Sequence, residues 1–298
     1  MTKLQLNCGA ATDTGLVRDH NEDRYWIDPD RGAFLVVDGV GGQVAGERAA
    51  DIAVSAIRES LEGLSVTEPE QHVREAIALA NNRIYDSAHD DPTLSGMACV
   101  LTLALVDAEQ VTIGHVGDSR LYLIAGGAIR KITPDHSLVG EIEDAGELSE
   151  EEAMAHPRRN EVFRDVGSSR RLADQGGFIE VLRCHFPEDA AILLCSDGLS
   201  DHLTSRRIRE IVERYAGDAG QTSRNLVQAA NLAGGRDNIT AVFIAGPSFR
   251  GRGTTATRPR LGATRVLPRR GLWTGRLAFL SYGLLLGMLL WAVLRIRG

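Results

Sequence analysis

The chain of 298 residues has only four cysteines, and no two of them form a CxxC pair. They stand far apart, at Cys8, Cys99, Cys184 and Cys195. Cys99, Cys184 and Cys195 fall in apolar or strand-like runs, so we interpret them as small buried thiols of a reducing compartment, not as a zinc site or a disulfide framework. The first ten residues contain no apolar run, so we expect no signal peptide.

Acidic residues are absent from Pro247 onward, where ten arginines occur. Subtracting these ten positive charges from the net charge of −7 leaves −17 for residues 1–246. An acidic domain of this kind disfavours nucleic acid as a partner, whereas a basic tail suits a surface of anionic lipid. The contents of 43% hydrophobic and 24% charged residues are ordinary for a folded protein.

The long uncharged run lies near the C-terminus, at residues 277–294. At about 1.5 Å per residue it spans roughly 27 Å, close to the hydrocarbon thickness of a bilayer. Trp273 and Trp291 stand near its ends, as interfacial anchors do. We therefore predict a transmembrane helix and short tail over residues 272–298, preceded by a flexible basic linker over residues 247–271. A buried core helix is the alternative.

The arginines around this run predict its orientation. Six lie within about twenty residues before it and two follow it, and the positive-inside rule then places residues 1–246 in the cytoplasm. The expected location is the inner (cytoplasmic) membrane, with a single pass and contact with membrane lipid. Gly283 and Gly287 have the GxxxG spacing, which would allow a weak dimer through the membrane helix.

Residues 1–246 show strand and helix patterns in an order that favours an α+β fold. Strands are predicted over residues 4–11, 24–27, 33–37, 98–106, 110–116, 120–124, 178–184, 190–195 and 239–245. Helices are predicted over residues 45–61, 69–88, 205–215 and 222–233. The long helical pair is inserted between hairpin-rich strands, which argues against a doubly wound parallel sheet. Residues 137–177 are polar and weakly periodic, and we interpret them as a flap of short helices.

Five short acidic motifs occur at predicted strand ends or turns. They occupy residues 18–23, 38–42, 117–120, 196–198 and 236–238. Each alone is explained by a turn. Together, carboxylates at the ends of neighbouring strands would repel one another unless a cation lay between them. Oxygen ligands without a pair of His or Cys residues suit Mg²⁺ or Mn²⁺ better than zinc.

A carboxylate site with two such ions predicts phosphoryl chemistry. Ions about 3.5–4 Å apart lower the pKa of a bridging water, and the resulting hydroxide attacks phosphorus in line. Arg18 would clamp the phosphate in a bidentate geometry that lysine cannot match. Arg18 is therefore a candidate catalytic residue.

In this order, the motifs resemble those of the protein phosphatase 2C family of metal-dependent Ser/Thr phosphatases, bacterial branch. The resemblance covers about residues 4–246, and residues 133–138 and 156–160 add further similar segments. It implies a catalytic domain over residues 1–246 that is a four-layer β-sandwich flanked by antiparallel helix pairs. It also implies two central Mn²⁺ or Mg²⁺ ions, often a third, and phosphorylated proteins as substrates, expected to be those of a Ser/Thr kinase.

The resemblance also assigns metal ligands. Asp38 should bridge both ions, which makes it a candidate catalytic residue beside Arg18. The Gly39 carbonyl and a water held by Glu22 should serve one ion, and Asp197 and Asp237 should serve the other.

Four more roles follow by the same resemblance. Asp118, together with Asp197, should hold the third ion. Arg18 should bind the substrate phosphate, Asp23 should support the ligands from the outer shell, and Asn238 should buttress the turn at Asp237.

Two departures from the family pattern leave alternatives open. Val40 stands where animal members have a histidine proposed as general acid, so protonation of the leaving group would fall to bound water. Ala98 and Cys99 replace small polar residues, which motivates a second hypothesis, a non-catalytic membrane-anchored binding module. A metal-dependent nuclease or small-molecule phosphatase is a third hypothesis. The charge of −17 disfavours nucleic acid, and the broad segment over residues 137–177 suits protein substrates better.

Three histidines require separate interpretation. We interpret His136, on a predicted loop, as a structural residue more readily than as a catalytic acid. His115 should be a sheet residue, and His20 should face solvent.

Overall fold

The computed structural model describes residues 5–62 and 68–252. The predicted membrane span, its GxxxG pair and the linker from residue 253 onward lie outside the described residues. Within the described ranges, no helix is both long enough and apolar enough to cross a bilayer.

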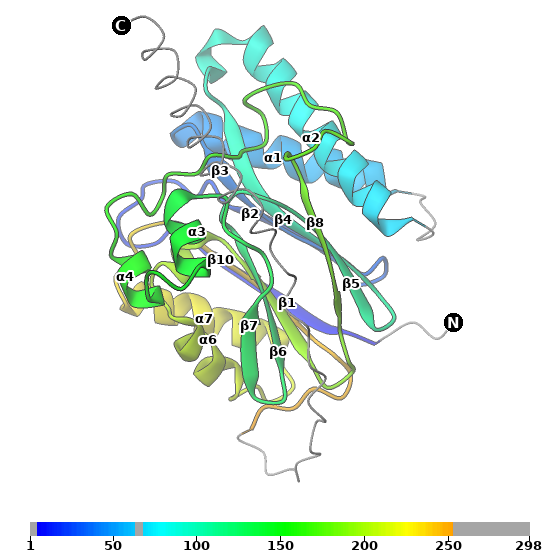
Figure 1. The fold of residues 1–298 in the computed structure, drawn as a ribbon, viewed down its shortest axis with the longest axis vertical. Helices are drawn as coiled ribbons and strands as arrows, with labels where there is room; N and C mark the ends of the chain where they lie inside the picture. Colours follow the sequence, from blue (N-terminus) through cyan, green and yellow to red (C-terminus); the bar gives the residue numbers. More distant parts are fainter. Residues whose placement is uncertain (1–4, 63–67, 253–298) are drawn as a thin grey trace, which may run out of the picture. The chain divides into compact units, whose positions relative to one another are not determined.

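Two five-stranded sheets form the centre of the domain, and every strand pairing in them is antiparallel (Figure 1). The first sheet has the order β1 (Asn7–Asp13), β10 (Ile239–Ala245), β9 (Ala191–Cys195), β6 (Arg120–Ala125) and β7 (Ala128–Lys131). The second has the order β2 (Arg24–Asp28), β3 (Ala33–Val40), β4 (Ala98–Asp107), β5 (Gln110–Val116) and β8 (Glu180–His185).

Helices cover the outer face of each sheet. The long helices α1 (Gln43–Leu61) and α2 (Pro69–Asp90) pack together and against the second sheet, and the 3₁₀ turn η1 (Pro92–Leu94) follows them. The first sheet carries α6 (Ser205–Val212) and α7 (Ala219–Leu232). Three short helices complete the domain: α3 (Leu138–Asp144), α4 (Glu150–Met154) and α5 (Asp197–Ser200).

The core divides into three apolar layers, as a sandwich with outer helices requires. One lies between the second sheet and α1 with α2, one between the two sheets, and one between the first sheet and α6 with α7. Strand β10 is buried along its whole length because both faces are covered: Val242 faces the other sheet and Phe243 faces the helices. The α+β fold with two antiparallel sheets and flanking helices is therefore confirmed.

Several predicted boundaries were wrong. The strand expected over residues 33–37 continues to Val40, because Asp38 pairs with Val100 and Gly39 with Cys99 across the ladder. Backbone pairing is indifferent to the polarity of these side chains, so the apolar run underestimates the strand. The first strand is shifted toward Asp13 by its register with β10, and β7 and α5 were not predicted. All four cysteines are free, as expected.

The packed chain continues past Gly246. Phe249 is only 6% exposed and belongs to the core under α6 and α7. Its ring centroid lies 5.4 Å from that of Tyr215 and 6.1 Å from that of Phe243. A version of the chain that ended at Gly246 would therefore lose part of this core.

Candidate active site

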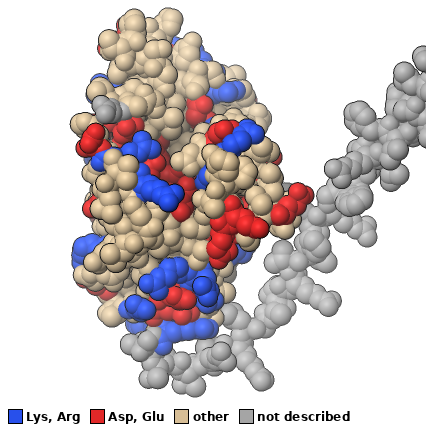
Figure 2. Space-filling model, turned by 90° about the vertical axis from the view of Figure 1, so that its left-hand side faces the viewer, with Lys and Arg blue, Asp and Glu red and all other residues tan. Residues whose placement is uncertain are grey.

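The five acidic motifs converge on one cavity of about 210 Å³. Its walls come from the loop before β2, the end of β3, the chain just after β5 and residues 160–162 of the flap. The chain just after β9 and the chain just before β10 complete them. The lining residues are Arg18, Glu22, Asp38, Gly39, Val40, Gly41, Gly42, Val100, Asp118, Asn160, Val162, Asp197, Asp237 and Asn238. Figure 2 shows one face of the molecule, where Asp and Glu side chains lie beside Lys and Arg side chains with uncharged surface around them.

Asp38 is at the electrostatic centre of this cavity. Burial raises the pKa of its carboxyl group well above the ordinary value, and the nearby charges of Asp23, Asp197, Asp118 and Asp237 raise it further. Such a group is stable as an anion only when positive charge is supplied. The pattern is that of a cation-binding carboxylate.

Asp197 begins the short helix α5 directly after β9, where the strand end carries it into the cavity. Burial raises its pKa and the charge of Asp237 adds to the effect, whereas Arg159 and a hydrogen bond with Asp38 lower it. The carboxyl groups of Asp38 and Asp197 are thus within hydrogen-bonding reach of each other. Burial also raises the pKa of Asp118 well above its usual range, and Asp197 again contributes.

Asp237 and Asn238 connect the start of β10 to the loop that carries Arg18. The Asn238 side chain donates hydrogen bonds to the carbonyls of Thr14 and His20, both at 2.9 Å, and accepts one from the backbone N–H of Glu22 at 2.8 Å. All of its amide is used for this connection, so its role is broader than the expected support of the Asp237 turn.

Asp23 lies behind the cavity and is 2% exposed. Its Oδ2 accepts a hydrogen bond from Ser196 Oγ at 2.7 Å, whereas its Oδ1 is buried without a hydrogen-bond partner among the described residues. Burial raises its pKa to about 7, although the hydrogen bond from Ser196 opposes the rise. This unsatisfied oxygen suits the outer shell of a cation site.

Glu22 reaches the cavity because two glycines leave room for it. A Cβ atom on Gly46 would lie 1.9 Å from Glu22 Oε2 and 3.0 Å from the carbonyl carbon of Gly39. A Cβ atom on Gly39 would lie 2.2 Å from the carbonyl oxygen of Gly46. The first turn of α1 therefore packs directly on the backbone of Gly39, and this contact fixes the carbonyl expected to bind an ion.

The sequence alone did not reveal a buried ionic network beneath the flap. Arg159 is 4% exposed; its Nε lies 2.8 Å from Asp201 Oδ1, its Nη1 3.6 Å from Asp118 Oδ2, and its Nη2 3.5 Å from Asp135 Oδ2. Arg120, also buried, donates to Asp135 at 2.7 Å. The motifs at residues 117–120, 133–138 and 156–160 contained Arg120, Asp135 and Arg159, but nothing in their spacing indicated this pairing.

The three histidines lie as predicted. His115 is buried in β5, with Nε2 2.9 Å from the Pro134 carbonyl and Nδ1 2.9 Å from Thr102 Oγ1. His136 is buried beside it, and its Nδ1 accepts a hydrogen bond from the Gly117 N–H at 3.0 Å. Neither ring lines the cavity. His20 is exposed.

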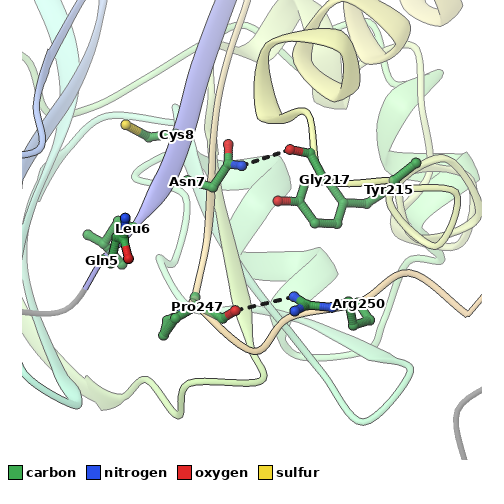
Figure 3. A pocket seen from close by; sticks show the side chains of 10 residues that line it. Gln5, Leu6, Asn7, Cys8, Tyr215, Gly217, Pro247 and Arg250 are labelled. Atoms are coloured by element: carbon green, nitrogen blue, oxygen red, sulfur yellow. Dashed lines mark hydrogen bonds between the residues drawn. The ribbon is translucent and has the colours of Figure 1, made fainter.

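A larger cavity, about 680 Å³, lies at the other ends of β1 and β10 (Figure 3). Asn7 and Gly217 line it and share a hydrogen bond of 2.8 Å. Its one charged lining residue is Arg250, which donates to the carbonyls of Pro247 and Phe249. No carboxylate lines it, so the chemistry belongs to the smaller cavity.

The carboxylate cavity fits divalent cations by the chemistry of its donors, all of which are oxygens. Among the described residues, no three Asp, Glu, His or Cys side chains are already arranged as a ligand set for one ion. Arg18 forms an ion pair with Asp237, and Asp38 and Asp197 are buried carboxyl groups that each shift the pKa of the other. The expected ligand set also contains the Gly39 carbonyl and water, so side chains alone do not complete it.

The sandwich and its carboxylate cavity define a metal-dependent serine/threonine protein phosphatase. The family model described as "Protein phosphatase 2C" matches residues 14–233 of the chain. The chain therefore belongs to the protein phosphatase 2C family.

Individual relatives are bacterial. The serine/threonine phosphatase stp of Listeria monocytogenes is 34% identical over 240 residues, which are 78% of this chain and 93% of that protein. The crystal structure of the Mycobacterium tuberculosis phosphatase PstP/Ppp superimposes with a TM-score of 0.73 at 29% identity, covering 81% of this chain and 98% of that one. The catalytic domain of PstP in complex with two manganese ions gives a TM-score of 0.71 at 28% identity, covering 80% and 97%.

Proposed function

We propose that this phosphatase hydrolyses phosphoserine and phosphothreonine monoesters on proteins with two Mn²⁺ or Mg²⁺ ions in the carboxylate cavity. The observation that carries the proposal is the convergence of Asp38, Asp197 and Asp237, from three different strand ends, on one small cavity. Burial and the charges of Asp197 and Asp237 raise the pKa of the Asp38 carboxyl group, and divalent cations would offset this effect. The PstP complex with two manganese ions supports the same number of ions here.

Each ligand has a role that its position supports. Asp38 would bridge the two ions, the Gly39 carbonyl and a water held by Glu22 would complete one, and Asp197 and Asp237 would complete the other. Asp118 and Asp197 would hold a third. When bound, the ions would supply an activated water nucleophile and offset charge on the phosphoryl oxygens.

The chain's own residues orient the substrate. Arg18 lines the cavity and is half exposed, so its guanidinium would pair with phosphoryl oxygens that enter from solvent. Asn238 fixes the loop that carries Arg18. Val40 lines the cavity but has no proton to donate, so it cannot protonate the leaving alkoxide.

The binding-module alternative receives no support from the residues that motivated it. Ala98 and Cys99 are both buried in β4, and the thiol of Cys99 belongs to the core under α1 and α2. The neighbour that does reach the cavity is Val100. The departure therefore affects packing behind the site and leaves every carboxylate in place.

Turnover of p-nitrophenyl phosphate and of a phosphothreonine peptide tests the proposal. Both should be hydrolysed in Mn²⁺ or Mg²⁺ and not in chelator, and the Asp38→Asn variant should be inactive while its circular dichroism spectrum is unchanged. Absence of turnover by well-folded protein with either metal would refute the proposal.

The catalytic domain would act at the inner face of the cytoplasmic membrane, tethered through residues 272–298. This part of the proposal is supported by the uncharged run, its tryptophans and the arginines before it. Cell fractionation of the full-length chain and of a version ending at Arg252 tests it. Recovery of both in the soluble fraction would contradict it. Cross-linking of the full-length chain would show whether Gly283 and Gly287 support a dimer.

A further inference from the structure

Five exposed large apolar side chains belong to the three chain segments that form part of the catalytic cavity wall. We call them the apolar lip: Leu16, Val17, Val40, Val44 and Phe163. Each has between 42% and 73% of its surface exposed. They make up five of the nine exposed large apolar residues in the described part of the chain. Scattered exposed apolar residues need no explanation, but a group around one site does.

Each lip residue either lines the cavity or stands within two residues of a lining residue in the chain. Leu16 and Val17 directly precede Arg18, Val40 lines the cavity itself, and Val44 lies in the first turn of α1 after the lining residue Gly42. Phe163 follows Val162, which also lines the cavity. The same three segments therefore supply both the polar interior and the apolar margin.

We propose that the apolar lip selects substrates with aliphatic side chains next to the phosphorylated serine or threonine. This inference rests on the proposed function and specifies its substrate class. The phosphoryl group would enter the polar cavity, and the flanking residues of the peptide would then lie over the margin. Aliphatic flanks would remove lip surface from water, whereas acidic flanks would approach a region of −17 net charge over residues 1–246.

Three phosphothreonine peptides of equal length test the preference with the full-length protein in Mn²⁺. They carry leucine, serine or aspartate at both positions beside the phosphothreonine. One methylene group in a closed pocket changes kcat/KM by about 10- to 200-fold, so an open lip should give on the order of fivefold to tenfold between leucine and serine flanks. The aspartate peptide should be the poorest. The difference should lie in KM, because the contact exists before and during the reaction.

The double variant Leu16→Ser/Val44→Ser should abolish the preference for leucine over serine flanks. Leu172→Ser is the matched control, because Leu172 is as exposed as Leu16 and Val44 but lies outside the three segments. All proteins should hydrolyse p-nitrophenyl phosphate equally, since it has no flanking residues. A wild type without preference, or a double variant that retains it, would overturn the assignment of the lip. Loss of p-nitrophenyl phosphate turnover in every protein would instead refute the proposed function, and the lip with it.

Discussion

The Nη2 atom of Arg18 lies 2.7 Å from Oδ2 of Asp237, so a residue expected to bind phosphate is paired with one expected to bind a metal ion. Arg18 supplies the positive charge that Asp237 would otherwise take from a cation. The Arg18 side chain is 51% exposed, so Asp237 holds one side of it while about half of its surface faces solvent. An ion at Asp237 would release the guanidinium toward substrate.

Replacing Arg18 with alanine should therefore separate substrate binding from metal binding. Charged hydrogen bonds to phosphate are each worth about 1.5–3 kcal/mol, so KM for a phosphopeptide should rise by roughly 10- to 100-fold. Affinity for Mn²⁺ should not fall, because the competing cation on Asp237 is gone. Arg18→Lys should restore charge but not the bidentate contact. Weaker Mn²⁺ binding in calorimetry of Arg18→Ala would show that Arg18 supports the metal site instead.

Asp38→Asn should remove activity without unfolding the protein. Loss of the bridging ligand should lower kcat by at least about 10³-fold, since it removes both ion positioning and charge stabilisation. The metal-free variant should be as stable as wild type, because Asp38 is crowded by like charges.

Mn²⁺ at 100 times its Kd should stabilise wild type by about 2.7 kcal/mol and the variant by much less. Asp107→Asn, at the exposed end of β4, is the control; equal stabilisation of Asp38→Asn and wild type would argue against Asp38 as a ligand.

Gly46→Ala should weaken the site although it lies in a helix. Alanine normally stabilises a helix over glycine by about 0.5–1 kcal/mol. Here its Cβ would lie 1.9 Å from Glu22 Oε2, so Glu22 must move and the apparent Kd for Mn²⁺ should rise. Gly220→Ala in α7 meets only side-chain ends, Arg224 Nη1 at 3.2 Å and Asp218 Oδ1 at 3.4 Å, and should be neutral or stabilising. Unchanged Mn²⁺ affinity in Gly46→Ala would mean that the position of Glu22 is unimportant.

Arg159→Met should destabilise the protein by roughly 3–5 kcal/mol, because Asp201 and Asp135 would remain buried without this partner. The neighbouring Arg158→Met removes only an exposed ion pair with Glu161, which solvent screens, and should leave the free energy of unfolding nearly unchanged. Urea unfolding at neutral pH measures both. Similar midpoints for the two variants would show that the buried network contributes little.

The contribution of His115 to stability should fall as pH decreases from about 6.5 to about 4. Burial lowers the pKa of His115 to about 4, below the ordinary value of about 6.5 that applies in the unfolded chain. Between these values the unfolded chain binds more protons, so the free energy of unfolding rises with pH and is lost on acidification, by about 3 kcal/mol. His115→Gln should flatten this dependence in denaturant titrations, whereas exposed His89→Gln should not. An unchanged slope in His115→Gln would assign the acid sensitivity to other groups.

Local patterns were enough to predict most of the domain's elements. Apolar periodicity placed α1 and α2 within two residues at either end, and residues 239–245 were predicted as the strand that β10 forms. The candidate ligands were predicted because their motifs are short and contiguous. Periodicity failed at Asp38 and Gly39, where a polar pair continues the strand because its backbone bonds to β4.

The sequence by itself determined which residues are candidates for the chemistry: oxygen donors after apolar strands, an arginine near them, and no thiol or imidazole cluster among them. Only the tertiary structure decided which of these touch. The pairing of Arg18 with Asp237, the attachment of Asn238 to Thr14 and His20, and the ionic network around Arg159 join segments far apart in the chain. Such contacts depend on how two sheets and a flap pack together, and the pattern of neighbouring residues does not encode them.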